Sequence, residues 1–505
     1  MSEVERKRRL LVLVVAYHAA STLRSVLERI PRSVLDEYDC EVLVVDDASV
    51  DRTFEVGCEY GEAHPEIRLT VLRNRFNQGY GGNQKVGYAF AIQEGFDTVA
   101  LIHGDGQYAP EALPRLLEPL RDGTADAVLG SRMLDRGAAL RGGMPLYKYV
   151  GNRILTALQN ALLGTHLSEF HSGFRLYSVA TLRSLPYQLN TNKFHFDTEI
   201  IIQLLNSGAR IVERPIPVYS GTEISRVNGI SYAVSVLRAT WANVLHRWSL
   251  FYQRRYDTSR PGESPYPLKL GYPSSHSHAL AAVPSGARVL DIGGGPGGVA
   301  RELVAKGCSV AMVDRVRPRD IPADTIVYLQ DLNEELRFPI AEYDYILLLD
   351  ILEHLAEPER FLARLRARFD YRPRTVVISV PNVAFVVQRL MLLLGQFNYG
   401  KAGILDLTHT RLFTFRTLMQ ILDDAGFRIR RIQGVPAPFP RALGNGRLGR
   451  AAVRLNAALI HISRALFSYQ ILVVAETTPD VDFVLRDTTT RSSRPWSQRP
   501  PTAQS

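Results

Sequence analysis

Residues 101–108 read LIHGDGQY, a short apolar run that passes directly into acidic and amide side chains. A second boundary of this kind lies at residues 289–298, where the apolar run of VLDIGGGPGG ends in a glycine-rich turn. Each stretch predicts a buried β-strand that ends in a polar loop, which is where α/β domains bind ligands. The two stretches lie about 190 residues apart, farther than most single domains extend. We therefore expect two α/β domains, each with its own site.

The bulk composition is that of a globular protein with more than one core. Of the 505 residues, 46% are hydrophobic and 22% are charged, as in ordinary folded domains. A chain of this length exceeds a single hydrophobic core. The three cysteines, Cys40, Cys58 and Cys308, are scattered and form no CxxC pair, which argues against a disulfide framework or a zinc site. This cysteine usage predicts a reducing, cytoplasmic environment.

The charge balance points to anionic partners. The net charge of +9 favours phosphorylated substrates or anionic membranes. No arginine-rich run with interleaved aromatic residues is present, so we expect no nucleic-acid partner. The apolar run at residues 10–16 is too short for a signal peptide or a membrane span, and the run at 383–397 is interrupted by Gln388 and Arg389. No transmembrane helix is predicted.

The first 250 residues alternate short β-rich apolar runs with helical patterns, which predicts a mostly parallel sheet covered on both faces. The helical patterns include residues 21–30 and 82–94. The predicted strands are residues 10–16, 41–46, 69–72, 98–103 and 127–130. A second alternation of this kind begins near residue 287.

Changes in composition predict the domain boundaries. Residues 251–280 are rich in turn formers and lack periodicity, so we expect a linker between a first domain at 1–250 and a second at 281–478. Residues 479–505 become rich in Thr, Ser, Arg and Pro, which predicts a disordered tail.

The first domain carries the oxygen ligands that a bound diphosphate and its cation require. A hard divalent cation such as Mg²⁺ or Mn²⁺ prefers oxygen atoms, and Asp105 with Gln107 can place two of them beside one ion. Asp46 and Asp47, after an earlier strand, supply hydrogen-bond acceptors for a nucleoside. Taken alone, each acidic cluster reads equally well as a turn or a helix N-cap.

In combination and order, these motifs resemble the family 2 glycosyltransferases with the GT-A fold, especially the dolichol-phosphate mannose synthase-like branch that uses polyprenyl phosphates. The resemblance covers about residues 8–225. The matching stretches are VVAYH at 14–18, VVDDAS at 44–49, NQGYGGN at 77–83, GDGQYAPE at 104–111, GSR at 130–132, SGFR at 172–175 and FDTE at 196–199.

The resemblance implies a role for each matching residue. Asp105 and Gln107 would bind the metal, while Arg132 and Arg175 would face phosphate groups, which a guanidinium matches with paired hydrogen bonds. The residues that would line the nucleotide-sugar donor are Ala16, Tyr17, Asp46, Asp47, Gly79 and Asp105.

Several positions leave alternatives open, and for Arg132 and Arg175 the alternative is a surface ion pair. The family's metal motif usually begins with Asp, whereas this chain has His103, which would ligate Mn²⁺ better than Mg²⁺ or would instead contact the ribose. Glu199 is the carboxylate that would serve as general base for a hydroxyl acceptor; its alternative role is a charge at a helix N-terminus. A polyprenyl phosphate is already ionised, and we expect its oxygen to displace the donor in line with inversion.

An amphipathic pattern follows the first domain. Such a helix would lie at a membrane interface on the inner face of the cell membrane, or would pack between the two domains. Its apolar positions are Ile230, Val234, Leu237, Trp241, Leu245 and Trp248, and its cations are Arg226, Arg238, Arg247, Arg254 and Arg255.

The second domain contains a glycine-rich motif that is compatible with two kinds of ligand. Gly293, Gly295 and Gly298 satisfy GxGxxG, and Asp314 follows at the end of the next strand, as in dinucleotide-binding domains. However, Asp291 stands beside the position of a pyrophosphate, where a carboxylate is unfavourable. A ligand with a sulfonium and an ammonium group suits it better.

The same stretch resembles the class I S-adenosylmethionine-dependent methyltransferases, over about residues 285–475. Further matches are YDYILLLDILEHL at 343–355, SVPN at 379–382, LFTFRTL at 412–418 and AGF at 425–427. The resemblance implies a Rossmann-like fold with S-adenosylmethionine as cofactor. The residues that would contact it are Asp291, Gly293, Gly295, Asp314, Asp331 and Asp350.

Two histidines are candidate bases for a hydroxyl that accepts the methyl group. His354 falls on a predicted helix just after a strand, where capping or packing is the alternative role. His409 lies in the polar loop DLTHTR at 406–411, which would cover the site.

We therefore expect a bifunctional enzyme of one surface-glycan pathway. The first domain would transfer a sugar from a nucleotide-sugar to a polyprenyl phosphate or a glycan, with a divalent metal, and the second would methylate a sugar or a related product. Two alternatives remain open. In one, the second domain binds S-adenosylmethionine without catalysis; in the other, a degenerate first domain docks an active methyltransferase.

Overall fold

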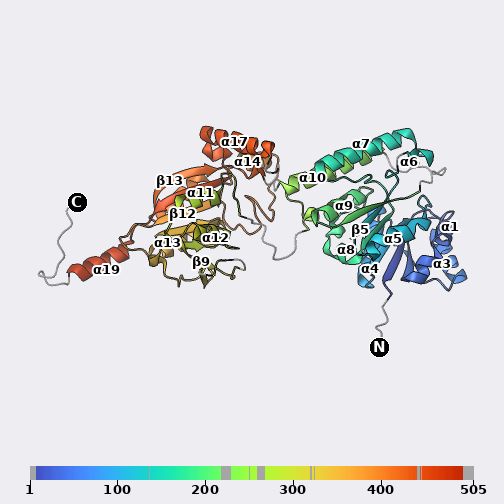
Figure 1. Ribbon diagram of the computed structural model, residues 1–505, viewed down its shortest axis with the longest axis horizontal. Coiled ribbons are helices and arrows are strands. Elements are labelled where there is room, and N and C mark those ends of the chain that lie inside the picture. The colour runs from blue at the N-terminus through green and yellow to red at the C-terminus, as the bar shows by residue number, and fades with distance from the viewer. Residues whose placement is uncertain are drawn as a thin grey trace, which may run out of the picture. The chain divides into compact units, whose positions relative to one another are not determined.

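The computed structural model describes residues 7–135, 137–217, 229–248, 251–258, 268–318, 321–323, 325–440, 444 and 446–492. The chain divides into two compact units, each with one seven-stranded sheet flanked by helices (Figure 1). The first unit comprises Met1–Arg247 and Gln253–Pro261, and the second comprises Trp248–Tyr252 and Gly262–Ser505.

The first sheet has the order β3-β2-β1-β4-β6-β5-β7. Its strands run parallel except β6, which is antiparallel to both neighbours. The strands are β1 (Arg9–Ala16), β2 (Asp39–Asp46), β3 (Leu69–Arg73), β4 (Thr98–His103), β5 (Ala127–Ser131), β6 (Arg175–Ser178) and β7 (Ile211–Pro215). The helices are α1 (Leu23–Glu28), α2 (Arg32–Glu37), α3 (Thr53–Ala63), α4 (Tyr80–Gln93), α5 (Leu113–Arg121), α6 (Ala138–Arg141), α7 (Leu146–Leu163), α8 (Val179–Ser184), α9 (Phe196–Asn206) and α10 (Gly229–Arg247).

The side chains of β1 explain why this sheet is covered on both faces. Leu10, Val12 and Val14 pack into one hydrophobic cluster, and Leu11 and Leu13 pack into a second. Because successive side chains of a strand point to opposite faces, a strand that is apolar at each position from Leu10 to Ala16 needs helices on both sides. The expectation of a mostly parallel, doubly covered sheet is confirmed.

The second sheet has the order β10-β9-β8-β11-β12-β14-β13, and β14 runs antiparallel to both neighbours. The strands are β8 (Arg288–Ile292), β9 (Ser309–Asp314), β10 (Ile326–Leu329), β11 (Tyr345–Leu349), β12 (Thr375–Pro381), β13 (Arg428–Val435) and β14 (Gln470–Glu476). The helices are α11 (Ser275–Ala282), α12 (Gly298–Ala305), α13 (Pro358–Arg366), α14 (Val386–Leu393), α15 (Phe415–Asp424), α17 (Arg447–Ile462), α18 (Arg464–Phe467) and α19 (Val481–Ser492).

Three local expectations differ from the structure. The stretch around His354 is a single 3₁₀ turn, Leu352–His354, rather than an α-helix. Part of the expected linker is ordered, since α11 begins with a capping box in which Ser274 and Ser277 bind each other's backbone. The expected disordered tail contains α19, whose first turn is held by Asp480 through the backbone N–H of Phe483. Residues 493–505 and Arg226 lie outside the described part of the chain.

Candidate functional sites

In the first unit, the sheet register brings three strand ends together. Strand β1 lies between β2 and β4, with Ala16 opposite Asp46 and Val15 opposite His103. The loops after these strands therefore meet at one edge of the sheet, as expected for a ligand site of an α/β fold. The predicted donor and metal residues that share this edge are Ala16, Tyr17, Asp46, Asp47, His103, Asp105 and Gln107.

Asp46 and Asp47 are both buried and shape the loops around this edge. Asp47 accepts hydrogen bonds from the backbone N–H groups of Gln78 and Gly79, at 2.8 and 2.9 Å, and so holds the loop that starts α4. Asp46 accepts a short hydrogen bond from the Ser49 hydroxyl, while its Oδ2 has no hydrogen-bond partner among the described residues. This oxygen instead lies 3.5 Å from Arg73 Nε in an ion pair, which compensates the charge of the buried carboxylate.

Gly79 has a backbone conformation that other residues rarely adopt. Its φ is +79°, and a Cβ atom there would lie 2.7 Å from the carbonyl oxygen of Asn192. Glycine is therefore required where the loop held by Asp47 passes close to the segment before α9.

His103 takes part in a buried network with Tyr80 and Asp197. The Tyr80 hydroxyl donates to Asp197 Oδ2 at 2.8 Å and lies 3.2 Å from His103 Nε2. Since the hydroxyl proton is committed to Asp197, His103 Nε2–H donates to the Tyr80 oxygen, so Nδ1 is the ring nitrogen that carries the lone pair. Burial lowers the pKa of His103, although the charge of Asp105 opposes this shift, so the ring is neutral at pH 7.

The metal motif thus offers one carboxylate, one amide and one imidazole at the end of β4. Asp105 Oδ1 accepts the backbone N–H of Gln107 at 3.1 Å, which folds the motif into a tight turn. Asp105 is partly exposed and Gln107 is exposed, so a ligand at this edge could reach both positions. Two oxygen ligands and a neutral imidazole suit Mn²⁺ better than Mg²⁺.

Arg132 is paired within the protein. Its guanidinium forms a short ion pair with the buried Glu169, and its backbone N–H donates to the same carboxylate at 2.8 Å. Asn152 also donates to Glu169, at 2.8 Å. The Arg132 side chain keeps some exposure, so a phosphate reaching it would compete with Glu169.

Arg175 does not face an open site, contrary to expectation. Its side chain is 1% exposed, and its three nitrogens donate to the carbonyl oxygens of Ser172, Asp197 and Phe170 at 2.7, 2.8 and 2.7 Å. The Arg175 guanidinium also forms an ion pair with the Asp197 carboxylate, at 3.5 Å. Arg175 therefore organises the loop before β6 and holds Asp197 rather than meeting a donor phosphate.

Glu199 is likewise closed to a substrate in this structure. Its carboxylate accepts the backbone N–H of Thr191 at 2.6 Å and pairs with the Arg255 guanidinium at 2.7 Å. It lies in the first turn of α9, where a negative charge stabilises the helix. The geometry thus favours the structural alternative over a general base.

In the second unit, Asp291 is a buried carboxylate near the end of β8. It is 1% exposed, and its Oδ2 has no hydrogen-bond partner among the described residues. Burial raises the pKa of Asp291 to about 7, and the charge of Asp314 adds to the rise. A bound cation would supply the missing partner, as the predicted contact with the cofactor requires.

The glycine-rich turn after β8 has the shape that a nucleotide-sized ligand needs. Gly293 has φ +74°, and a Cβ atom there would lie 1.9 Å from Ile351 Cδ1. Gly295 has φ +53° with open space around it, and its N–H donates to Asp314 Oδ2 at 3.0 Å. Asp331, after β10, is partly exposed and accepts the backbone N–H of Asn333 at 2.9 Å. These residues line the ends of adjacent strands β8, β9 and β10.

Asp350, at the end of β11, is held by three other side chains. Its oxygens accept from Ser379 at 2.6 Å, Gln470 at 2.8 Å and Lys269 at 3.0 Å. Burial opposes ionisation of this carboxyl, but the Lys269 ammonium and the Ser379 hydroxyl lower its pKa to about 2. Sequence reasoning missed Lys269 and Gln470, because neither lies in a recognisable motif.

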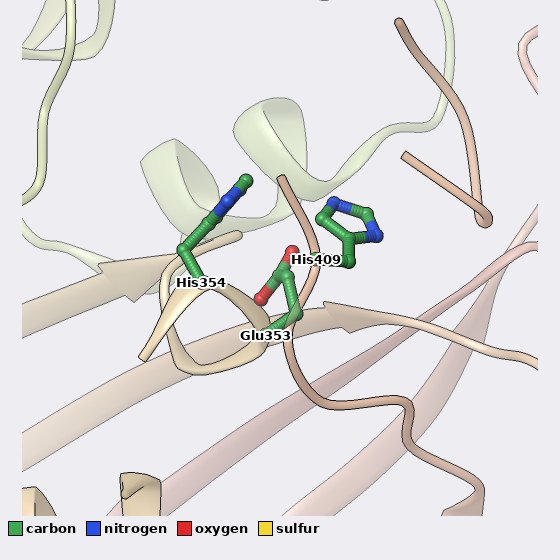
Figure 2. A group of neighbouring side chains, drawn as sticks. All are labelled: Glu353, His354 and His409. Atoms are coloured by element: carbon green, nitrogen blue, oxygen red, sulfur yellow. The ribbon is translucent and has the colours of Figure 1, made fainter. Parts of the chain in front are cut away.

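A cavity opens beside Asp350 and contains both candidate histidines. Figure 2 shows the rings of His354 and His409 on either side of the Glu353 carboxylate. Burial, and then the charge of Asp350, raise the pKa of Glu353 well above its usual range. Burial lowers the pKa of His409, so its ring is neutral at pH 7. The residues lining the cavity include Lys269, Tyr272, Asp350, Glu353, His354, His409, Tyr469 and Gln470.

Comparison with known proteins identifies both units. A family model described as "Glycosyl transferase family 2" matches residues 11–185, and one described as "Methyltransferase domain" matches residues 271–432. An undecaprenyl-phosphate mannosyltransferase of Micrococcus luteus is 30% identical over 243 residues, which cover 48% of this chain and 96% of the relative. The chain belongs to glycosyltransferase family 2, and a methyltransferase domain follows its glycosyltransferase domain.

Other proteins are similar to part of this chain. Polyprenol monophosphomannose synthase of Mycolicibacterium smegmatis is 27% identical over 214 residues, which cover 42% of this chain and 78% of the relative. Glucosyl-3-phosphoglycerate synthase from Mycobacterium tuberculosis, solved with Mn²⁺ and uridine-diphosphate-glucose, aligns with a TM-score of 0.37 and 20% identity, over 47% of this chain and 79% of that one.

Proposed function

We propose that the first unit transfers a sugar from a nucleotide-sugar to a polyprenyl phosphate, and that the second unit methylates that sugar, or a related product, with S-adenosylmethionine. The main support for the proposal is that polar loops meet at the ends of β2, β1 and β4. The relatives of the chain include an undecaprenyl-phosphate mannosyltransferase. A glycan acceptor is the alternative substrate for the same site.

The donor site fits a divalent cation. Asp105, Gln107 and His103 Nδ1 would hold it, and the cation would neutralise the diphosphate that leaves. Asp46, which lies opposite Ala16 in the sheet, and the exposed Tyr17, which follows Ala16, would line the nucleoside. Asp47 would act on the donor indirectly, because it holds the loop that carries Gly79.

The closed environment of Glu199 supports a phosphate acceptor. A hydroxyl needs a base to remove its proton, and Arg255 and Thr191 occupy the carboxylate that sequence reasoning nominated. A phosphate is already ionised at pH 7 and needs only alignment for in-line displacement. Of the predicted arginines, Arg132 is the one with an exposed portion that could assist.

Two neighbouring helices of the first unit support peripheral contact with a membrane. Helices α7 and α10 pack on each other (Figure 1), and each carries several exposed apolar side chains. Apolar side chains mixed with cations suit the surface of an anionic bilayer. We call this surface the α7/α10 face; its exposed apolar residues are Leu146, Tyr147, Val150, Ile154, Leu158, Ile230, Val234 and Trp241, and its exposed cations are Lys148, Arg153, Arg238 and Arg247. No helix in the described ranges is long and apolar enough to cross a membrane.

The second unit fits S-adenosylmethionine. The unsatisfied Asp291 Oδ2 and the open turn around Gly295 lie beside Asp314, whose carboxylate would bind ribose hydroxyls. The cavity beside Asp350 lies beyond the end of β11, on the other side of β8 from β9 and β10. We assign this cavity to the methyl acceptor. When bound, the cofactor supplies the electrophilic methyl group.

The test combines both reactions. Purified protein is incubated with a short polyprenyl phosphate, a panel of nucleotide-sugars and Mn²⁺, with and without S-adenosylmethionine, and the lipid is weighed by mass spectrometry. We expect a gain of one sugar, plus one methyl group only when the cofactor is present. Asp105→Asn should abolish the sugar gain, whereas the surface control Asp122→Asn should not. No gain with any donor would reject the lipid acceptor, and sugar without methyl would leave the second unit as a binding module.

A further inference from the structure

Resting on the proposed methyl transfer, we propose that Glu353, His354 and His409 bind a divalent transition-metal ion at the wall of the acceptor cavity, with open coordination positions for two neighbouring hydroxyl oxygens of the acceptor sugar. The three residues come from two segments, the turn Leu352–His354 and the loop around His409. Their ligand atoms all lie within 4.8 Å of one another, close enough to share one ion (Figure 2).

The hydrogen bonds of the two imidazoles prepare them as ligands. His409 Nδ1 lies 2.9 Å from the carbonyl oxygen of Ile404, and His354 Nδ1 lies 3.3 Å from that of Thr408. A carbonyl oxygen only accepts, so each Nδ1 carries the proton and each Nε2 keeps its lone pair. A backbone carbonyl that receives the second ring N–H is the usual support of a histidine that binds metal.

The buried carboxyl group of Glu353 independently indicates that this site binds a further group. Its side chain is 1% exposed, and its Oε2 has no hydrogen-bond partner among the described residues. Leaving a carboxylate oxygen buried and unsatisfied costs free energy, so such an atom usually meets a cation, a donor or a metal. The neighbouring rings of His354 and His409 stand where an ion could join all three groups.

Backbone hydrogen bonds fix the two segments against each other. The Thr410 N–H donates to the carbonyl of Glu353 at 2.8 Å, and its hydroxyl donates to the carbonyl of Leu355 at 2.7 Å. His409 N–H donates to the carbonyl of Asp406 at 3.0 Å, within the loop itself. The three ligands are therefore held in place before any ion binds, which reduces the ordering cost of binding.

The chemical types of the three ligands determine which ions the site would bind and how such an ion would act on the acceptor. Two imidazoles and one carboxylate suit Zn²⁺, Mn²⁺, Co²⁺ or Fe²⁺ rather than Mg²⁺ or Ca²⁺. Three protein ligands leave positions open toward the cavity, where two neighbouring hydroxyls of a sugar fit. An ion there lowers the pKa of a hydroxyl that it binds.

In the transfer, the S–CH₃ bond breaks and an O–CH₃ bond forms, the hydroxyl proton goes to solvent, and the sulfonium becomes a neutral thioether.

The first experiment titrates Co²⁺ into the full chain and follows its visible absorption, with stoichiometry measured by elemental analysis after dialysis. We expect Glu353→Gln and His409→Gln to bind one equivalent fewer than wild type, or to bind it at least about tenfold more weakly. Glu357→Gln and His461→Gln, exposed on the same unit, should bind as wild type does. Retained binding of S-adenosylmethionine by each variant shows that the unit is folded. Equal Co²⁺ binding by folded variants and wild type overturns the site.

A second measurement tests the open positions. A small hydroxamate, which chelates through two oxygen atoms, should change the Co²⁺ spectrum of wild type but not that of folded Glu353→Gln. An unchanged wild-type spectrum overturns the acceptor role of the ion. These readouts do not require methyl transfer, so failure of the metal site and failure of the proposed reaction are distinguishable.

Discussion

Three residues other than glycine adopt positive φ among the described residues, and all three follow strands that end at a candidate site. They are His18 at +53°, Ala48 at +59° and Asp350 at +55°. Such conformations cost free energy and persist only where the surroundings hold them. The backbone N–H of His18 donates to Ser49 Oγ at 2.9 Å, and that of Asp350 donates to the Ser379 carbonyl at 2.9 Å. The strain thus coincides with the loops that the proposal assigns to the nucleoside and to the methyl acceptor.

Gly293 gives the sharpest residue-scale test of the methyltransferase site. Gly293→Ala would add both an unfavourable φ and a clash with Ile351, whereas Gly295→Ala would add only the unfavourable φ. We expect Gly293→Ala to abolish binding of S-adenosylmethionine, measured by calorimetry, and Gly295→Ala to weaken it less. Both variants should keep the glycosyl transfer of wild type. Equal binding by the two variants would contradict the steric role of Gly293.

Asp291 should make stability depend on pH. Its folded pKa of about 7 lies above the unfolded value, so the stabilisation by its protonated form is complete below pH 4 and is lost as the pH rises through 7. Asp291→Asn removes this loss and should stabilise the second unit relative to wild type at pH 8, by about 4 kcal/mol at most. Thermal unfolding at pH 5 and pH 8, with the surface variant Asp424→Asn as control, measures the difference.

The same substitution should weaken binding of S-adenosylmethionine at pH 8, because a neutral amide replaces the carboxylate that would face a cationic ligand. A variant as stable as wild type at both pH values would show that Asp291 ionises freely in the folded state. A variant that is more stable but binds the cofactor as tightly as wild type would remove Asp291 from the cofactor site.

At the scale of elements, sequence patterns predicted the strands well because burial on both faces leaves a strong signal. Residues 10–16 and 98–103 are almost wholly apolar, and the structure places β1 and β4 there. Strand ends then follow from the polar residues that come next, which is why His103 and Asp105 were located correctly on the edge of the sheet. Helix ends were less certain, since α4 begins at Tyr80 rather than at residue 82.

The orientation of charged side chains could not be predicted in the same way. Arg175 and Glu199 fit their motifs, but their partners Asp197 and Arg255 become neighbours only in the folded chain. The sequence also marked His354 and His409 separately, 55 residues apart, whereas the contact that joins them depends on the fold. A motif thus indicates which residue types are present, while tertiary packing decides whether each one faces a ligand.

The α7/α10 face permits a test at the scale of two helices. Ile154 and Trp241 are 57% and 48% exposed, so Ile154→Glu with Trp241→Glu removes apolar contact and adds negative charge with little effect on the core. We expect the double variant to bind vesicles that contain anionic lipid at least about tenfold more weakly than wild type in co-sedimentation. Sugar transfer to a short, water-soluble acceptor should be unchanged.

A matched control separates this surface from general charge effects. Glutamines at Arg24 and Arg115, which lie on other exposed positions of the same unit, lower the net charge by two, as the helix variant does, without removing apolar side chains. If Arg24→Gln with Arg115→Gln lowers vesicle binding as much as the helix variant does, the attraction depends on net charge alone. Equal binding by wild type and the helix variant would remove the α7/α10 face from the proposal.

At the scale of the whole molecule, the chain joins two units that each have a sheet and hydrophobic clusters of their own. Separate cores allow a defect in one site to leave the other intact, because distant sites act nearly independently. The chain joins a glycosyltransferase domain to a methyltransferase domain, and the proposed function gives the two a shared product. If sugar transfer comes first, the methyl acceptor is the lipid-linked sugar. If methylation comes first, the methyl acceptor is the nucleotide-sugar.

Two variants, each defective in one unit, can establish this order. Asp105→Asn should lack sugar transfer but bind S-adenosylmethionine, and Gly293→Ala should show the reverse. If the lipid-linked sugar is the methyl acceptor, a mixture of the two should form methylated glycolipid, because the product of one variant diffuses to the other. Asp105→Asn supplied with the purified glycolipid should methylate it without any nucleotide-sugar. If Asp105→Asn instead methylates the nucleotide-sugar and leaves the glycolipid unchanged, methylation precedes transfer, and the second unit prepares the donor that the first unit uses.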